Sequence, residues 1–246
     1  MSELQIIPDR YRVLSGSMLK LLALFAMIVD HTAHALLSSE GPVLFRVYKW
    51  GITPYYLMRA FGRIAFPIYA FLLVEGFIHT RDRRKYGLRL ALFTLISEVP
   101  WDLLHFGRPF ELSSQSVFVT LLLAYLGLCV LERLQSASSR SELCRWAVRL
   151  LALFFVATVA KSDYGVRGFA MTLVLYLLQM QLVVQAVVCS AYVGNPCYAV
   201  LGFVPIALYN GERGFIRGRF LQLLFYAAYP AHMLLLYAIR MRTGQG

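Results

Sequence analysis

Charged residues are scarce in this sequence. Only 15% of its 246 residues are Asp, Glu, Lys or Arg, against about 25% in an ordinary soluble domain, and 59% are hydrophobic. This balance excludes an intrinsically disordered chain, a basic nucleic-acid-binding domain and most soluble enzymes. The apolar residues occur in long blocks separated by short polar gaps. Such a pattern indicates an integral membrane protein with several spans.

Cysteine is rare as well, and the common catalytic signatures are absent. The chain has four cysteines and no Cys-x-x-Cys pair, so their spacing indicates neither a zinc site nor a redox site. It contains no His-Glu-x-x-His, Gly-x-Ser-x-Gly or P-loop motif. The common zinc proteases and serine hydrolases are therefore excluded, and ATP-driven transport is unsupported.

The apolar blocks predict the fold. A membrane-spanning helix needs about 20 mostly apolar residues, and eight such blocks occur, at 17–37, 62–79, 88–106, 117–134, 146–160, 166–188, 192–209 and 220–239. A ninth span fits in the uncharged stretch 168–208, which Gly194-Asn195-Pro196 interrupts. We expect an all-α, polytopic membrane bundle of 8–9 transmembrane helices that forms one domain over residues 1–246.

The basic residues predict the orientation. The net charge is +11, and the positive-inside rule places basic loops in the cytoplasm. The densest cluster directly follows the second block and comprises Arg81, Arg83, Arg84, Lys85 and Arg89. We therefore expect this loop and the short N-terminal segment 1–16, which lacks signal-peptide features, on the cytoplasmic side of the membrane. A later cluster lies on that side only after nine crossings or a re-entrant segment; it comprises Arg213, Arg217 and Arg219.

Several ionisable residues lie inside the predicted spans, although each costs about 2.5–3.5 kcal/mol at the centre of a membrane helix. They are Asp30, His31, His34, Arg63, Glu75, His79, Glu98, Asp102, His105 and His232. The adjacent pair Asp30-His31 is the clearest candidate, because a carboxylate near an imidazole fixes its tautomer and raises its basicity, as a general base requires.

Other members of this group leave alternatives open. His79 and His105 lie near predicted membrane boundaries, where contact with solvent or lipid headgroups explains them better than chemistry does. Arg63 and Glu75 either pair inside the bundle or contact a substrate. The sequence also allows His31, His34, His105 and His232 to meet in space, although their spacing forms no metal motif and we expect no metal.

Several segments resemble one known family, and they occur in order along the chain. They are KLLALFAMIVDH (20–31), GRIAFPIYAFLLVEGFIHT (62–80), RLALFTLISEVPWDLL (89–104), YNGERG (209–214) and FYAAYPAHMLLL (225–236). Together they resemble the TraX family of conjugation-associated membrane proteins. The resemblance implies a membrane acyltransferase that moves an acetyl group from cytoplasmic acetyl-CoA to an amine or hydroxyl at or beyond the membrane, with the N-terminal amine of pilin as the family's acceptor.

The resemblance also suggests roles for particular residues. The wider group of membrane acyltransferases uses a membrane-embedded histidine as general base, and His31 is its counterpart here; Asp30 is the expected orienting partner, and Glu98 a third catalytic candidate. Arginine binds phosphate oxygens in bidentate fashion, so we expect the coenzyme to contact Arg63, Arg81, Arg84 and Arg89. The last three are explained equally well as plain topology signals. The substrate or auxiliary candidates are His34, Glu75, Asp102, Asn210, Tyr229 and His232, although Asn210-Gly211 also reads as a plain turn.

Other functions fit parts of the same pattern. The expected partners are acetyl-CoA, a peptide, sugar or lipid acceptor, and membrane lipids, with no nucleic acid; the sequence does not indicate an oligomeric state. The main alternative is a proton-coupled transporter or export component without acyl-transfer chemistry, in which carboxylates relay protons. A structural assembly factor is less attractive, because a scaffold gains nothing from buried charges.

Overall fold

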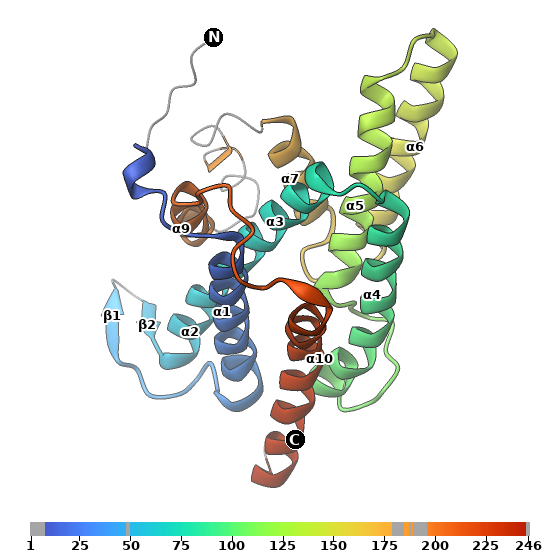
Figure 1. The fold of residues 1–246 in the computed structure, drawn as a ribbon. Helices are drawn as coiled ribbons and strands as arrows, with labels where there is room; N and C mark the ends of the chain where they lie inside the picture. Colours follow the sequence, from blue (N-terminus) through green and yellow to red (C-terminus); the bar gives the residue numbers. More distant parts are fainter. Residues whose placement is uncertain (1–7, 48–49, 179–184, 187, 189–195, 245–246) are drawn as a thin grey trace.

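The protein is almost entirely helical, as expected. The computed structural model describes residues 8–47, 50–178, 185–186, 188 and 196–244 (Figure 1). Its longer helices are α1 (Gly16–Leu36), α3 (Ala65–His79), α4 (Arg83–Phe106), α5 (Val117–Gln135), α6 (Arg140–Val159) and α10 (Gly218–Thr243). The shorter ones are η1 (Asp9–Tyr11), α2 (Pro54–Gly62), α7 (Gly165–Leu177) and α9 (Pro196–Ala207). Strands β1 (Phe45–Val47) and β2 (Trp50–Ile52) form an antiparallel hairpin that the sequence did not predict.

Four helical segments among the described residues are long and apolar enough to cross a membrane. They are Gly16–Leu36, Pro54–His79, Val117–Gln135 and Phe220–Thr243. The protein is therefore an all-α protein whose helices fit an integral membrane protein, while the number of 8–9 spans stays a prediction. The blocks predicted at 166–188 and 192–209 lie partly outside the described residues, as does part of the N-terminal segment.

The second span begins earlier than its hydropathy indicates. Thr53 precedes Pro54, which stands at the first position of α2, where its fixed φ and missing N–H suit a helix start. The chain then turns at Arg63 and Ile64 into α3. The predicted start at Gly62 therefore lies eight residues too late, and the extra helix brings Arg59 into the bundle.

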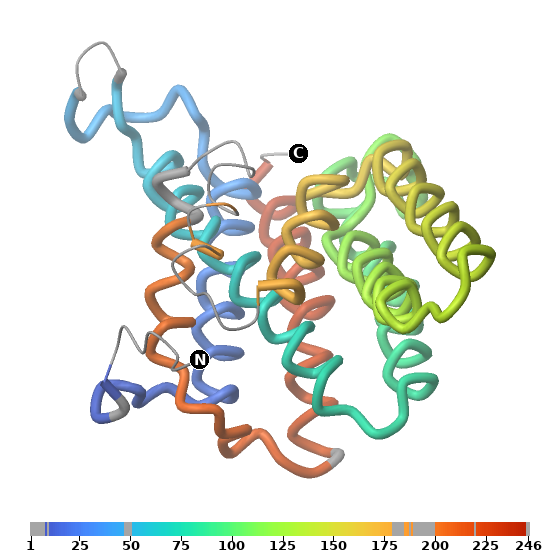
Figure 2. Tube along the Cα trace, turned by 90° about the horizontal axis from the view of Figure 1, so that it is seen from above, coloured from blue at the N-terminus to red at the C-terminus, as the bar shows by residue number. Residues whose placement is uncertain are grey.

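Helix α3 lies at the centre of the bundle. It packs against α1, α5, α7 and α9, while α10 packs against α1 and α4. Figure 2 shows α5 and α6 as a hairpin at one side of the molecule. The largest fully buried side chains of the core include Phe66, Phe77, Phe169, Ile68 and Leu104.

A loop from the end of α9 to α10 holds the start of α1. Gly16 donates its N–H to the Glu212 carbonyl oxygen (2.7 Å), and the Ser17 hydroxyl donates to that of Arg213 (2.9 Å). The N–H of Ile216 donates to the same hydroxyl (2.7 Å). We call residues 209–217 the strap. It places Arg213 at the end of the bundle where α1 begins. The sequence alone left open on which side of the membrane Arg213 lies.

Candidate functional site

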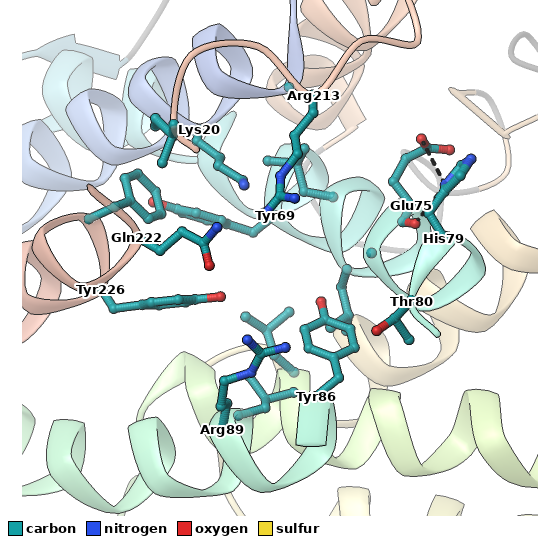
Figure 3. A pocket seen from close by; sticks show the side chains of 18 of the residues that line it. Lys20, Tyr69, Glu75, His79, Thr80, Tyr86, Arg89, Arg213, Gln222 and Tyr226 are labelled. Atoms are coloured by element: carbon teal, nitrogen blue, oxygen red, sulfur yellow. Dashed lines mark hydrogen bonds and ion pairs between the residues drawn. The ribbon is translucent and has the colours of Figure 1, made fainter. Parts of the chain in front are cut away.

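A pocket of about 630 Å³ lies at the end of the bundle where α1, α4 and α10 begin. Its volume is typical of small-molecule and cofactor sites. Four basic side chains line it, and they come from four different segments: Lys20, Arg81, Arg89 and Arg213. Figure 3 shows Lys20 and Arg213 across the pocket from Arg89 and Tyr86, with Gln222 and Tyr226 along one side. The pocket therefore offers positive charge and aromatic surface to a ligand.

The arginines predicted to bind a cofactor divide into two groups. Arg81 and Arg89 line the pocket. Arg84 is exposed and lies outside its wall. Arg63 is also outside the wall, on a different part of the bundle. Lys20 and Arg213, which sequence reasoning used only for topology, complete the basic lining.

Glu75 is the acidic residue of the pocket wall. Its carboxylate accepts a hydrogen bond from the Tyr209 hydroxyl (3.3 Å) and lies 3.7 Å from Nδ1 of His79. Burial, together with the negative charge of Glu75, raises the pKa of Tyr209 to about 12, so this hydroxyl keeps the proton that it donates. The alternative in which Glu75 pairs with Arg63 inside the bundle is therefore wrong.

Asn210 shapes the strap instead of contacting the pocket. Its side-chain Oδ1 accepts from the N–H of Glu212 (2.9 Å), which is the hydrogen bond of an Asx turn. Its neighbours Tyr209 and Gly211 line the pocket, whereas Asn210 does not. The plain-turn interpretation is therefore sufficient for this residue.

The pocket ends at Tyr229. This side chain lines the pocket, is only 4% exposed, and lies with its ring centre 6.2 Å from that of His31 and 5.6 Å from that of His232. Its hydroxyl is buried and has no hydrogen-bond partner among the described residues. Because buried polar groups are nearly always hydrogen-bonded, this hydroxyl is suited to receive a ligand or water.

His31 and His232 form a directly hydrogen-bonded pair behind Tyr229. His31 is 6% exposed, and its Nδ1 lies 2.8 Å from Nε2 of His232 in nearly parallel rings. The Nδ1 of His232 lies 2.9 Å from the Ala228 carbonyl oxygen. Since a carbonyl oxygen only accepts, His232 carries its proton on Nδ1 and accepts from His31 through Nε2. His31 therefore keeps a free lone pair on its own Nε2, as a general base requires.

Asp30 does not orient His31. Adjacent residues of a helix point about 100° apart, so Asp30 points away from His31. Its carboxylate instead forms an ion pair with the Arg59 guanidinium. His232 takes the position that the sequence assigned to Asp30. Gly62 makes the ion pair possible, because a Cβ at this position would overlap the Asp30 side chain where α2 approaches α1.

Arg63 belongs to a polar group beside this ion pair. Its guanidinium lies over the Tyr164 ring, 5.8 Å from the centre. Asp163 has an exposed surface, yet many protein atoms lie around its carboxyl group and displace water from it. This desolvation raises the pKa of the carboxyl, and the nearby Arg63 and Arg59 oppose that rise. Sequence reasoning missed Arg59, Asp163 and Tyr164 because they lie outside the predicted spans, although the Thr53-Pro54 helix start gives a signal for Arg59.

The two remaining acidic candidates hold the connection between α4 and α5. Glu98 accepts from the N–H (3.2 Å) and hydroxyl (2.5 Å) of Ser116, the N-cap of α5. Asp102 accepts from the N–H of Glu111 (3.0 Å) in the loop between these helices. Ser116 thus engages the Glu98 carboxylate, and the catalytic role expected for Glu98 stays a prediction.

Two further histidines lie beyond the central pair, away from the pocket. His105 stacks on Trp101 (3.7 Å between ring centres) and on His34 (4.4 Å), and it lies 6.1 Å from His31. The four histidines of the spans thus do meet in space. Within the described part of the chain, however, no three His, Cys, Asp or Glu side chains are placed to hold a metal ion.

Comparison with known proteins agrees with the resemblance seen in the sequence. The chain is 28% identical over 257 residues to the probable fimbrial assembly protein FimC, serogroup H1, of Dichelobacter nodosus, and the match covers 92% of this chain and 96% of that protein. No solved structure matches the chain. The family model described as TraX protein matches residues 15–240. The chain therefore belongs to the TraX family.

Proposed function

We propose that this protein is a membrane acetyltransferase that moves the acetyl group of cytoplasmic acetyl-CoA to an acceptor at or beyond the membrane. One observation carries the proposal: a basic pocket ends at Tyr229, whose ring contacts a histidine with a free lone pair on Nε2. The pocket end of the bundle then faces the cytoplasm, with the N-terminus on the same side.

The pocket suits the chemistry of the proposed donor. Coenzyme A carries a 3′-phosphate and a pyrophosphate, and guanidinium and ammonium groups bind such oxygens with charge-assisted hydrogen bonds. Lys20, Arg81, Arg89 and Arg213 supply four positive charges from different segments. With the phosphates at these groups, the thioester extends toward Tyr229 and the histidine pair.

His31 acts as the base in this proposal. The acceptor nitrogen attacks the thioester carbonyl, and its N–H proton moves to Nε2 of His31 as the C–N bond forms. The C–S bond then breaks, and the protonated imidazole returns the proton to the leaving sulfur. Nε2 of His232 accepts a hydrogen bond from Nδ1 of His31 and so holds the His31 ring. His232 also stabilises the positive charge that develops on this ring.

The acceptor we favour is the N-terminal amine of a pilin. Pilin acetylation is what the family resemblance implies, and the similar protein of Dichelobacter nodosus is described as a probable fimbrial assembly protein. Sugar hydroxyls and lipid headgroups are the alternatives. A comparison of peptide, sugar and lipid acceptors under one assay identifies the acceptor class.

The direct test uses purified protein in nanodiscs. Acetyl-CoA is added with a synthetic membrane-inserted helical peptide that has a free N-terminal amine, and mass spectrometry follows the gain of one acetyl group. We expect transfer that depends on His31 and saturable binding of CoA. Absence of CoA binding, together with a substrate flux driven by a pH gradient, would replace this proposal with the transporter.

A further inference from the structure

Helices α1, α4 and α10 run in the same direction through the site. Their first turns line the pocket through Lys20, Arg89 and Gln222. Their last turns bring together His34, His105 and Arg240. The central histidine pair lies between these two ends, so the helices connect an anion-binding end with an imidazole-rich end.

The rings at the far end have a defined order. His31 is buried, whereas His105 and His34 are half-buried. The ring centres are 6.1 Å apart between His31 and His105, and 4.4 Å apart between His105 and His34. One water molecule can bridge the ring nitrogens of His31 and His105 at such a separation, whereas His105 and His34 are in direct stacking contact. Imidazoles therefore extend from the buried base toward the ends of α1 and α4.

His105 is oriented as a proton acceptor. Its Nδ1 donates to the Trp101 carbonyl oxygen (3.0 Å), so its Nε2 carries the lone pair when the ring is neutral. Trp101 packs flat against one face of the ring and His34 lies against the other. This packing holds the acceptor nitrogen in place independently of the central pair.

We propose that His105 and His34 remove the first proton from a positively charged acceptor amine and release it at the end of the bundle opposite the pocket. This inference rests on the proposed function and names the acceptor as an ammonium group. The two proton tasks are then divided. The outer rings convert the ammonium group to the nucleophilic amine, and His31 moves the second proton from nitrogen to sulfur.

The proton balance requires such a step. The overall reaction is acetyl-CoA + R–NH3⁺ → R–NH–CO–CH3 + CoA–SH + H⁺, so one of the two protons lost by nitrogen ends on sulfur and the other leaves the protein. With the donor in the pocket, the outer histidines offer this proton a separate route toward the opposite end of the bundle. A hydroxyl acceptor would release no net proton and would not need the outer pair.

The charged groups around the outer pair favour release of the proton to solvent. Arg59 of α2 and Arg240 of α10 are the guanidinium groups that act on both rings, and His31 faces them from within α1. Arg240, together with the Arg59 guanidinium that Asp30 partly compensates, opposes a lasting positive charge on either imidazole. A proton taken from the acceptor therefore passes to solvent at the helix ends.

The test compares two acceptors in nanodiscs. One is the membrane-inserted peptide with an aliphatic N-terminal amine, and the other is the same peptide with an N-terminal aminobenzoyl group, whose aromatic amine is already neutral at pH 7. An α-amino group has a pKa of about 8, so about a tenth of it is neutral at pH 7. We expect His105→Phe to lower kcat about tenfold for the aliphatic amine and less than twofold for the aromatic amine, with an unchanged KM for acetyl-CoA.

The pH profile and a second variant sharpen this test. The loss of kcat with His105→Phe should disappear as the pH rises above the pKa of the acceptor amine. His34→Gln should show the same pattern to a smaller extent. Phe106→Leu, at the neighbouring exposed position, is the control and should leave both reactions unchanged. Imidazole in the buffer should restore His105→Gly on the aliphatic amine alone.

The possible outcomes distinguish failure of the proton path from failure of the proposed function. An equal loss on both acceptors would mean that His105 is structural, and no loss on either would remove the proton path while acetyl transfer stands. If the wild-type protein acetylates neither peptide, the proposed function fails and the proton path fails with it.

Discussion

The two ends of α1, α4 and α10 differ in the charge that they present. The starts of these helices gather fixed cations and tyrosines around a pocket, whereas their ends gather imidazoles, whose charge changes with a proton, beside the guanidinium groups of Arg59 and Arg240. Fixed cations bind anions, and imidazoles move protons near neutral pH. In the proposed function, the same three helices separate donor binding from proton handling, with Tyr229 between the two.

The largest expected effect tests whether the histidine end contributes to turnover without contributing to donor binding at the pocket. His31→Gln should lower acetyl transfer by at least about 100-fold, which is the lower range for loss of a general base. Affinity for acetyl-CoA should stay unchanged, because His31 does not line the pocket. Turnover and calorimetric binding measure the two quantities. Thr32→Val, at the adjacent position, is the control. A weakened affinity for acetyl-CoA in His31→Gln would show that the histidine end also takes part in binding the donor.

Asp30→Asn tests whether the centre of the bundle serves structure or chemistry. The change leaves the Arg59 guanidinium without its counter-charge. Loss of one partner costs about 3–5 kcal/mol in a fully buried ion pair, and this pair is partly accessible, so we expect about 1–3 kcal/mol. Thermal unfolding in detergent measures the loss, and Arg59→Met on the same background should recover part of it. An equally stable but inactive Asp30→Asn protein would restore Asp30 to the catalytic group.

Two arginines on one helix define the boundary of the pocket. Arg89→Gln should weaken acetyl-CoA binding about tenfold, the equivalent of about 1.4 kcal/mol, because Arg89 lines the pocket. Arg84→Gln should change binding less than twofold, although the sequence pattern alone treats the two residues alike. Titration calorimetry at fixed salt distinguishes them. Equal effects would show that the anion-binding region extends beyond the pocket wall.

The smallest effect concerns the strap. Asn210→Ala removes one exposed turn hydrogen bond, so we expect a loss of about 0.5 kcal/mol in stability and little change in donor affinity. A large loss of affinity would mean that this side chain contacts the donor directly. Thermal unfolding and donor binding measured on the same sample separate these results.

The sequence predicts the helices better than their partners. The first span is predicted at 17–37 and found as α1, Gly16–Leu36, because hydropathy reports contact with lipid directly. The partner of His31 could not be predicted in this way. His232 lies 201 residues further along the chain, and only the packing of α10 against α1 brings the two rings together.

The candidate site shows the same division. Arg81, Arg89, Glu75 and Tyr229 were expected near a ligand, and they line the pocket. The predicted dyad Asp30-His31 failed for a geometrical reason, because neighbours on a helix point in different directions. Arg59 was missed because a short helix that begins at Pro54 has too few residues to produce a hydropathy signal of its own.

The strap has a consequence for biogenesis. Leu14 bonds to Leu208 and Asn210, and Gly16 bonds to Glu212, so the first helix receives its final neighbours only after most of the chain has left the ribosome. A nascent or truncated polypeptide that ends before residue 208 lacks one wall of the donor cavity. Under the proposed function, we therefore expect acetyl transfer only from chains that extend through the strap.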